Sequence, residues 1–148
     1  MTGDEQRTVA VTEARHWLGA MFHMNALLPY QAIDCGRLPW AVYSAVGITV
    51  PDLPPHWPKD FMLHRMAAGE PYLALIQQAL VEVDAPLPGD LAVFKPLRSN
   101  CFSHAALVVE WPVVIHACAH VHRVIEGRAD EWPLSGQPVR FFSPFGIK

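Results

Sequence analysis

The chain has 148 residues, which fits one domain at the usual size of ~150 residues. Hydrophobic residues make up 51% and charged residues 17%, so the chain has enough apolar material for a core and is not disordered. The net charge is −3 and no basic stripe is present, which argues against nucleic acid as a partner. Three cysteines cannot all pair with one another, so a disulfide scaffold is not expected.

The first residues, MTGDEQRTVAVTEA, lack the basic start and the apolar run of a signal peptide. No apolar stretch approaches the ~18 residues that a membrane-spanning helix needs. We therefore expect synthesis in the cytoplasm without a signal peptide, no membrane partner, and export, if any, by another route.

Helical periodicity dominates the first half of the chain. Ala10, Ala14, Trp17 and Leu18 form one apolar stripe, which Gly19 is placed to end. A second stripe covers 38–45 and stops at a glycine, and four prolines within 51–58 predict an irregular loop. Two further helices are expected at 58–69, with a proline in first position, and at 71–80.

Short β-branched and aromatic runs, separated by Pro, Gly and polar residues, follow in the second half. Helices first and strands later predict one α+β domain over 1–148, with N-terminal helices packed on an antiparallel sheet of about five strands. The predicted strands are 91–94, 103–110, 113–117, 122–126 and 139–142.

The segment IDCGRL holds the first candidate for chemistry. Asp34 is a good N-cap, which places Cys35 in the first turn of the next helix. Backbone N–H groups and the positive end of the helix dipole favour a thiolate there. The alternative is that Cys35 is a small buried hydrophobic residue.

Two histidines in the predicted strands are candidates for the base that a thiol nucleophile needs. His104 lies near the start of SHAALVVE, and His116 lies in VVIHA. If the helix packs across the sheet, one imidazole pairs with the thiol of Cys35 and the other orients the first by a hydrogen bond.

Four motifs occur in the order and spacing of the NlpC family of papain-like cell-wall cysteine peptidases, which the chain resembles. They are DCGRL (34–38), PGDLAVF (88–94), SHAALVVE (103–110) and VIHA (114–117), with twelve residues from His104 to His116. The stretch WLGAMFHMNALLPYQAIDC (17–35) is similar to the start of the phage-type branch of this family. The resemblance implies a papain-like, NlpC-type α+β fold.

The same resemblance implies roles for individual residues. Cys35 is the expected nucleophile, His104 the general base and His116 the third residue that orients the base. The backbone N–H of Cys35 is an expected oxyanion donor, and Phe22 occupies the place where many members carry a tyrosine hydroxyl. The residues expected to bind substrate are Asp34, Phe22, His23, Arg37 and Ser103.

Two residues depart from the family pattern. Arg37 occupies a position that is normally small, where it would crowd or charge the cleft. Pro39 lacks the N–H that would bond to Cys35. Either the helix kinks at Pro39, or it starts later and holds Pro39 in its first turn.

The remaining cysteines and histidines receive simpler interpretations. Cys101 is a spare thiol, and Trp40 and Trp57 are candidate walls of a binding groove. His116, Cys118, His120 and His122 alternate, which suggests zinc, but neighbouring ligands on one straight strand lie ~6.5 Å apart and cannot meet at one ion. We therefore expect a turn after His116, exposed later histidines, no metal and no cofactor.

The function that the resemblance implies is a cysteine endopeptidase acting on peptidoglycan stem peptides, usually at the γ-D-glutamyl–diamino acid bond. The phage-type start suggests a tail-associated protein of a phage or prophage, delivered to the cell wall, with other tail proteins as partners. The alternatives are an inactive tail-assembly module of the same fold, or a papain-like amidase or acyltransferase acting on another small amide.

Overall fold

The computed structural model describes residues 2–56 and 70–145. The described helices are α1 (Gly3–His16), α2 (Arg37–Ala45) and α3 (Pro71–Ala79). The strands are β1 (Met21–Phe22), β2 (Leu27–Leu28), β3 (Ala32–Ile33), β4 (Val81–Val83), β5 (Leu91–Phe94), β6 (His104–Glu110), β7 (Val113–Cys118), β8 (Arg123–Arg128) and β9 (Val139–Ser143).

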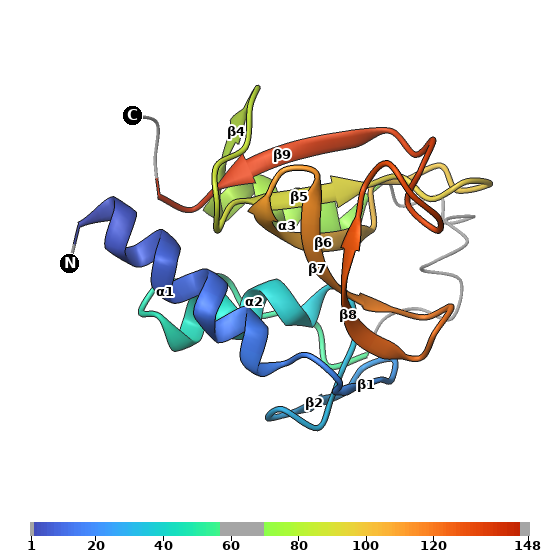
Figure 1. Ribbon diagram of the computed structural model, residues 1–148, viewed down its shortest axis with the longest axis horizontal. Helices are drawn as coiled ribbons and strands as arrows, with labels where there is room; N and C mark the ends of the chain where they lie inside the picture. The colour runs from blue at the N-terminus through green and yellow to red at the C-terminus, as the bar shows by residue number, and fades with distance from the viewer. Residues whose placement is uncertain (1, 57–69, 146–148) are drawn as a thin grey trace.

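All these strands join one curled sheet in the order β2-β3-β1-β8-β7-β6-β5-β9-β4 (Figure 1). Pairing is antiparallel throughout except between β1 and β3. The α+β class is confirmed, but the predicted strand number of about five is too small, because the described residues alone form a sheet of nine strands. The five predicted strands are β5–β9.

The four strands that the sequence did not predict, β1–β4, have only two or three residues each. Such segments are too short to show an alternating pattern. They are held by backbone pairing with distant parts of the chain, as Met21 is with Arg123 and Val81 with Ser143.

The predicted helices are confirmed where the structure describes them. Gly19 (φ +88°) and Gly47 (φ +84°) follow α1 and α2 in the left-handed conformation that ends a helix. Leu18 is 40% exposed rather than buried, because α1 ends at His16. The loop prediction holds for 51–56, and the helix predicted at 58–69 lies outside the described residues, as does Trp57.

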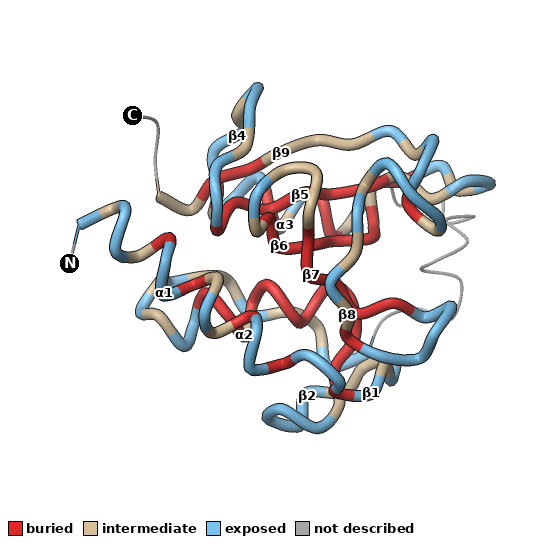
Figure 2. The backbone as a smooth tube through the Cα atoms, viewed as in Figure 1, coloured by how far each residue is buried: buried red, intermediate tan, exposed pale blue. Residues whose placement is uncertain are grey.

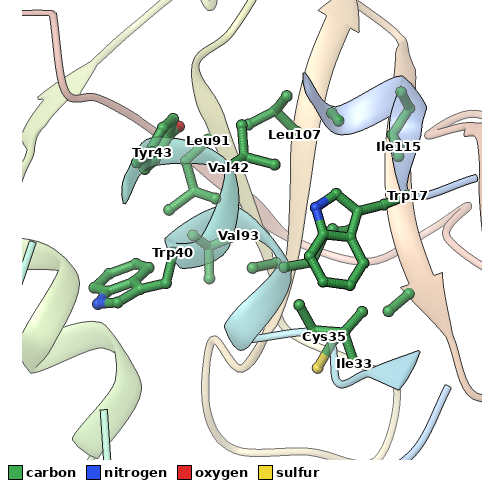
Figure 3. Packing of buried hydrophobic residues seen from close by; sticks show 14 of the residues in the cluster. Trp17, Ile33, Cys35, Trp40, Val42, Tyr43, Leu91, Val93, Leu107 and Ile115 are labelled. Atoms are coloured by element: carbon green, nitrogen blue, oxygen red, sulfur yellow. The ribbon is translucent and has the colours of Figure 1, made fainter. Parts of the chain in front are cut away.

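The main core lies between the sheet and the helices α1 and α2, which run along one side of it (Figures 1 and 2). Trp17, which directly follows α1, and Val42 from α2 pack there against Leu107 and Ile115 of β6 and β7 (Figure 3). Cys35 is part of this core. A smaller cluster on the other face of the sheet contains Ala92, Phe94, Ala106, Val108, Val114 and Leu134.

The PGD part of the second motif ties α1 to the start of β5. Asp90 accepts hydrogen bonds from the backbone N–H of Leu87 and from Nη1 of Arg7, each at 2.8 Å. Arg7 and Asp90 form a buried ion pair, with 7% and 2% of their side chains exposed. Within the described parts of the chain, no helix has the length and hydropathy of a bilayer span.

Candidate active site

A tight turn between β3 and α2 carries Cys35. The carbonyl oxygen of Asp34 accepts from the N–H of Leu38 (3.2 Å), and its Oδ1 accepts from the N–H of Arg37 (2.8 Å). These hydrogen bonds close the turn, but the N-cap of α2 is Gly36, which has no side-chain cap, so the prediction that Asp34 caps the helix is wrong.

The helix itself begins later than predicted. Pro39 has no N–H to donate to the carbonyl of Cys35, and α2 starts at Arg37 with Pro39 in its first turn. Cys35 therefore lies in the turn before α2. Its predicted place in the first helical turn is wrong, and the alternative of a later start is correct.

Arg37 folds back onto the turn instead of charging the cleft. Its Nη1 donates to Oδ2 of Asp34 at 2.6 Å, and its Nη2 donates to the carbonyl of Pro54. The side chains of Arg37 and Asp34 are 8% and 0% exposed, so the pair neutralises itself inside the protein. Both residues thereby fix the Cys35 turn, and direct substrate contact by either stays a prediction.

The thiol of Cys35 is protonated in the resting site. It is 2% exposed and donates to the carbonyl oxygen of Ser103 across 3.7 Å. Burial, and then the neighbouring charge of Asp34, raise the pKa of Cys35 to about 12. The expectation that this position favours a thiolate is wrong, because the short motif shows neither the burial nor the later helix start.

His104 and His116 form the pair that the sequence predicts. Nε2 of His104 lies 2.8 Å from Nδ1 of His116, and the rings meet edge to face at 87°. The pairing of β6 with β7 runs from Glu110↔Val113 to Leu107↔Ile115 and does not continue to His104. The two imidazoles thus meet where the strands part.

Both imidazoles are neutral at pH 7. Burial lowers the pKa of His104 well below its usual 6.5, and repulsion from His116 and His120 lowers it further. Burial, followed by His120, lowers the pKa of His116 to about 4. A single hydrogen therefore lies between the two facing nitrogens, and which ring owns it depends on their tautomers.

Cys35 meets β6 at its backbone, next to the base. The thiol contacts the carbonyl of Ser103, the residue before His104. His104 is paired with Phe94, so its ring leaves the strand on the face of the smaller cluster, whereas Cys35 packs into the main core on the opposite face. The predicted pairing of the thiol with an imidazole is therefore not formed in this structure. Among the described residues no hydrogen bond joins Cys35 to His104, whose Nδ1 is the ring nitrogen that His116 leaves available.

The remaining residues predicted to bind substrate are Ser103, Phe22 and His23. Ser103 is buried, Phe22 is half-buried, and the exposed His23 directs Nδ1 to the carbonyl of Met24 (3.0 Å). His23 lines a surface pocket of about 640 Å³. Trp40 and Arg37 line another of about 570 Å³.

Gly127, which the sequence analysis did not single out, leaves room for the ring of His116, the predicted third catalytic residue. A Cβ placed on Gly127 of β8 would lie 3.2 Å from Nε2 of His116, closer than ordinary van der Waals contact. The signal was present in the sequence, since a glycine within a strand often marks a close approach. The predicted strand 122–126 stopped one residue short of it.

The remaining cysteines do not form a metal site. Cys101 and Cys118 are buried and form no disulfide among the described residues, and His120 and His122 are exposed as predicted. β7 continues to Cys118, so the turn comes later than predicted. Across residues 2–56 and 70–145, no three His, Cys, Asp or Glu side chains are grouped to hold a metal ion.

Comparison with known proteins identifies the fold of this chain. No protein-family model matches the sequence. No curated protein matches it either. Solved structures do match. NlpC2 from Trichomonas vaginalis is 18% identical with a TM-score of 0.67 over 97% of this chain. The NlpC/p60 domain of the peptidoglycan hydrolase SagA is 20% identical with a TM-score of 0.58 over 90%.

The chain has the NlpC/P60 fold. The predicted resemblance is thereby confirmed at the level of fold. A protein of the NLP/P60 family from Staphylococcus aureus agrees as well, at 22% identity, a TM-score of 0.64 and 93% of this chain. This chain spans 96% of the SagA domain but only 47% and 41% of the T. vaginalis and S. aureus proteins.

Proposed function

We propose that this NlpC/P60 domain is a cysteine peptidase that hydrolyses an amide bond in peptidoglycan stem peptides. The observation that carries the proposal is the contact of 2.8 Å between His104 and His116, beside a thiol bonded to the residue before His104. A nucleophile, a base and a group that orients the base are the parts that thiol hydrolysis needs.

In this proposal the imidazole of His104 first turns from the face of the smaller cluster towards Cys35, and Sγ of Cys35 then transfers its proton to Nδ1 of His104. Sulfur attacks the substrate carbonyl, the C–N bond breaks, and His104 returns the proton to the leaving amine. Water then hydrolyses the thioester, with His104 as base again. His116 accepts the Nε2 hydrogen of His104 and stabilises the imidazolium that forms.

Because the thiol and both imidazoles are neutral at rest, the proton transfer does not take place before substrate binds. A thiol with a pKa of about 12 and imidazoles with lowered pKa values do not form an ion pair spontaneously. Each charge stabilises the other once both are present. In this mechanism proton transfer accompanies attack on the bound substrate, with the backbone N–H of Cys35 as oxyanion donor.

The substrate and setting follow from the family resemblance. We propose the γ-D-glutamyl–diamino acid bond as the target and a phage or prophage tail as the carrier, with other tail proteins as partners. The hydrolysis of peptidoglycan named for SagA supports the substrate class. Incubating the pure protein with defined muropeptides and separating the products tests the proposal: shortened stem peptides support it, and intact muropeptides contradict it.

A second candidate function is an inactive tail-assembly module of the same fold. The buried, protonated thiol of Cys35, which bonds to a backbone carbonyl, favours this alternative. Absence of turnover on several muropeptides, together with binding to other tail proteins, supports it. Cleavage of a small amide outside peptidoglycan would instead support an amidase or acyltransferase.

A further inference from the structure

The start of α3 makes two hydrogen bonds, one to each side of the candidate active site. The hydroxyl of Tyr72 donates to the carbonyl oxygen of Gly36 at 2.9 Å, and Gly36 directly follows Cys35. The N–H of Phe102 donates to Oε1 of Glu70 at 2.6 Å. Phe102 lies two residues before the first residue of β6. The start of α3 therefore contacts both the turn of the thiol and the strand of the base.

The local sequence fixes the geometry of this helix start. Pro71 occupies the first position of α3, where its restricted φ suits a helix and no N–H is needed. Glu70, before it, has φ −113° and ψ 85°, outside the helical region that a following proline disfavours. The side chains of Glu70 and Tyr72 thus project from the two sides of a rigid residue.

Tyr72 is held in the main core as a hydrogen-bond donor. It is 1% exposed, and its ring centroid lies 5.6 Å from that of Trp40 in α2. Leu73 and Ile76 of α3 are buried in the same core. Burial, and then nearby negative charges, raise the pKa of Tyr72 well above its usual 10. Its hydroxyl therefore keeps its proton and remains a donor.

A third contact closes these bonds into a cycle. The thiol of Cys35 donates to the carbonyl oxygen of Ser103 across 3.7 Å, and Ser103 directly follows Phe102. Three hydrogen bonds thus link the segments 35–36, 70–72 and 102–103 in a closed cycle. Because each bond limits the movement of the other two, the loss of one also loosens the contact of Cys35.

We propose that Tyr72 and Glu70 are positioning residues, which hold the thiol of Cys35 against the start of β6. The base, His104, is joined to Ser103 by a peptide bond, so the cycle keeps the backbone of His104 at a fixed separation from the thiol. Only the imidazole then has to turn before the proton transfer. The catalytic consequence rests on the proposed function, whereas the cycle of hydrogen bonds does not depend on it.

Alkylation of the buried thiol tests the cycle without any substrate. The thiol of Cys35 is 2% exposed, so iodoacetamide reaches it only when the turn opens. Tyr72→Phe removes one hydrogen bond and keeps the aromatic ring, and we expect about five- to ten-fold faster labelling of Cys35 at pH 9. Glu70→Met should have a similar effect. Glu70→Gln keeps an acceptor oxygen and should stay near the parent rate.

Tyr43→Phe is the matched control. Tyr43 is also buried, and its hydroxyl donates to the carbonyl oxygen of Gly89, again at 2.9 Å. This bond lies outside the cycle, so its loss should leave the labelling of Cys35 unchanged. Thermal melting shows whether Tyr43→Phe and Tyr72→Phe lose similar stability. If Tyr72→Phe does not fold, Glu70→Met and Glu70→Gln decide.

Turnover on a muropeptide provides a second readout. Neither positioning residue touches the substrate in this proposal, so Tyr72→Phe should lower kcat about five- to ten-fold and leave KM unchanged. Glu70→Met should lower kcat as well, and Glu70→Gln should restore most of it. Tyr43→Phe should change neither constant.

The proposal is overturned if Tyr72→Phe is labelled at the parent rate, or if Tyr43→Phe accelerates labelling equally. It is also overturned if the effects of Tyr72→Phe and Glu70→Met multiply in the double variant, because bonds of one cycle do not act independently. A raised KM with unchanged kcat contradicts a positioning role. If the parent cleaves no muropeptide, the proposed function fails, while labelling still reports the cycle. The two failures are therefore distinguishable.

Discussion

Sγ of Cys35 lies 3.7 Å from the carbonyl oxygen of Ser103, the residue directly before β6, which begins at His104. The thiol thus reaches the strand of the base through the backbone, at the end where β6 and β7 part. The predicted catalytic residues make two separate contacts, Cys35 to Ser103 and His104 to His116, which leave the thiol and the imidazoles on opposite faces of the sheet.

The buried thiol makes Cys35 a slow target for alkylation in the absence of substrate. Because its pKa is raised to about 12, the thiolate is rare throughout pH 5 to 9. Iodoacetamide labelling followed by mass spectrometry should show slower modification of Cys35 in the folded protein than in the protein unfolded by urea. Selective labelling of Cys35 at pH 5.5 would contradict a neutral resting site.

Acid should destabilise the protein through the histidine pair. The pKa of His116 drops from 6.5 in the unfolded chain to about 4 in the folded protein, so the unfolded chain binds the extra proton. The free energy of unfolding, fully present above pH 6.5, should therefore decrease by about 3 kcal/mol as the pH falls through 4. His104 shifts in the same direction.

Urea denaturation at pH 7.0, 5.5 and 4.5 measures this dependence. His116→Asn removes the titrating group and keeps a polar side chain for His104, so its stability should change less over the same range. Equal pH dependence in the parent and in His116→Asn would show that the acid sensitivity comes from other groups.

Gly127→Ala should displace the ring of His116. The added methyl group would lie 3.2 Å from Nε2, so either the ring or β8 must shift. We expect a loss of about 1–3 kcal/mol in the free energy of unfolding, typical of overpacking, together with a loss of turnover. In a His116→Asn background, where the shorter side chain leaves room, the cost of Gly127→Ala should be clearly smaller. An equal cost in both backgrounds would mean that the ring is not what the methyl group meets.

The buried ion pair of Arg7 and Asp90 should matter far more than an exposed one. Asp90→Asn leaves the guanidinium of Arg7 without its buried counter-charge, which should cost about 3 kcal/mol. The matched control is Glu126→Gln, because Arg15 and Glu126 pair at 2.7 Å with 46% and 43% of their side chains exposed. Its cost should stay below about 1 kcal/mol. Chemical denaturation of both variants measures the difference, and similar costs would contradict the structural role of the PGD motif.

Local patterns in the sequence were sufficient for much of this fold. Periodicity predicted α1–α3 and β5–β9, and Pro39 predicted the later of the two possible starts of α2. The short strands β1–β4 depend on pairing with distant segments, which leaves no local pattern.

The site was less predictable than the fold, because it depends even more on contacts between distant segments, which leave no local pattern in the sequence. The twelve-residue spacing predicted the contact between His104 and His116. The pKa direction of Cys35 depends on burial by the whole core, and the motif around it contains no sign of that burial. Gly127 reaches His116 only through the fold, because no motif links the two residues.

Hydrolysis of a γ-D-glutamyl–diaminopimelate peptide by the parent and by Cys35→Ala tests the central claim most directly. The account predicts that the parent cleaves the peptide and that Cys35→Ala does not, with little change in melting temperature because only one sulfur atom is lost. Cys101→Ala, which removes another buried thiol, should retain activity. His104→Ala should be nearly as damaging as Cys35→Ala, and His116→Ala less so. A parent protein that cleaves nothing, or a Cys35→Ala variant that cleaves equally well, would contradict the account.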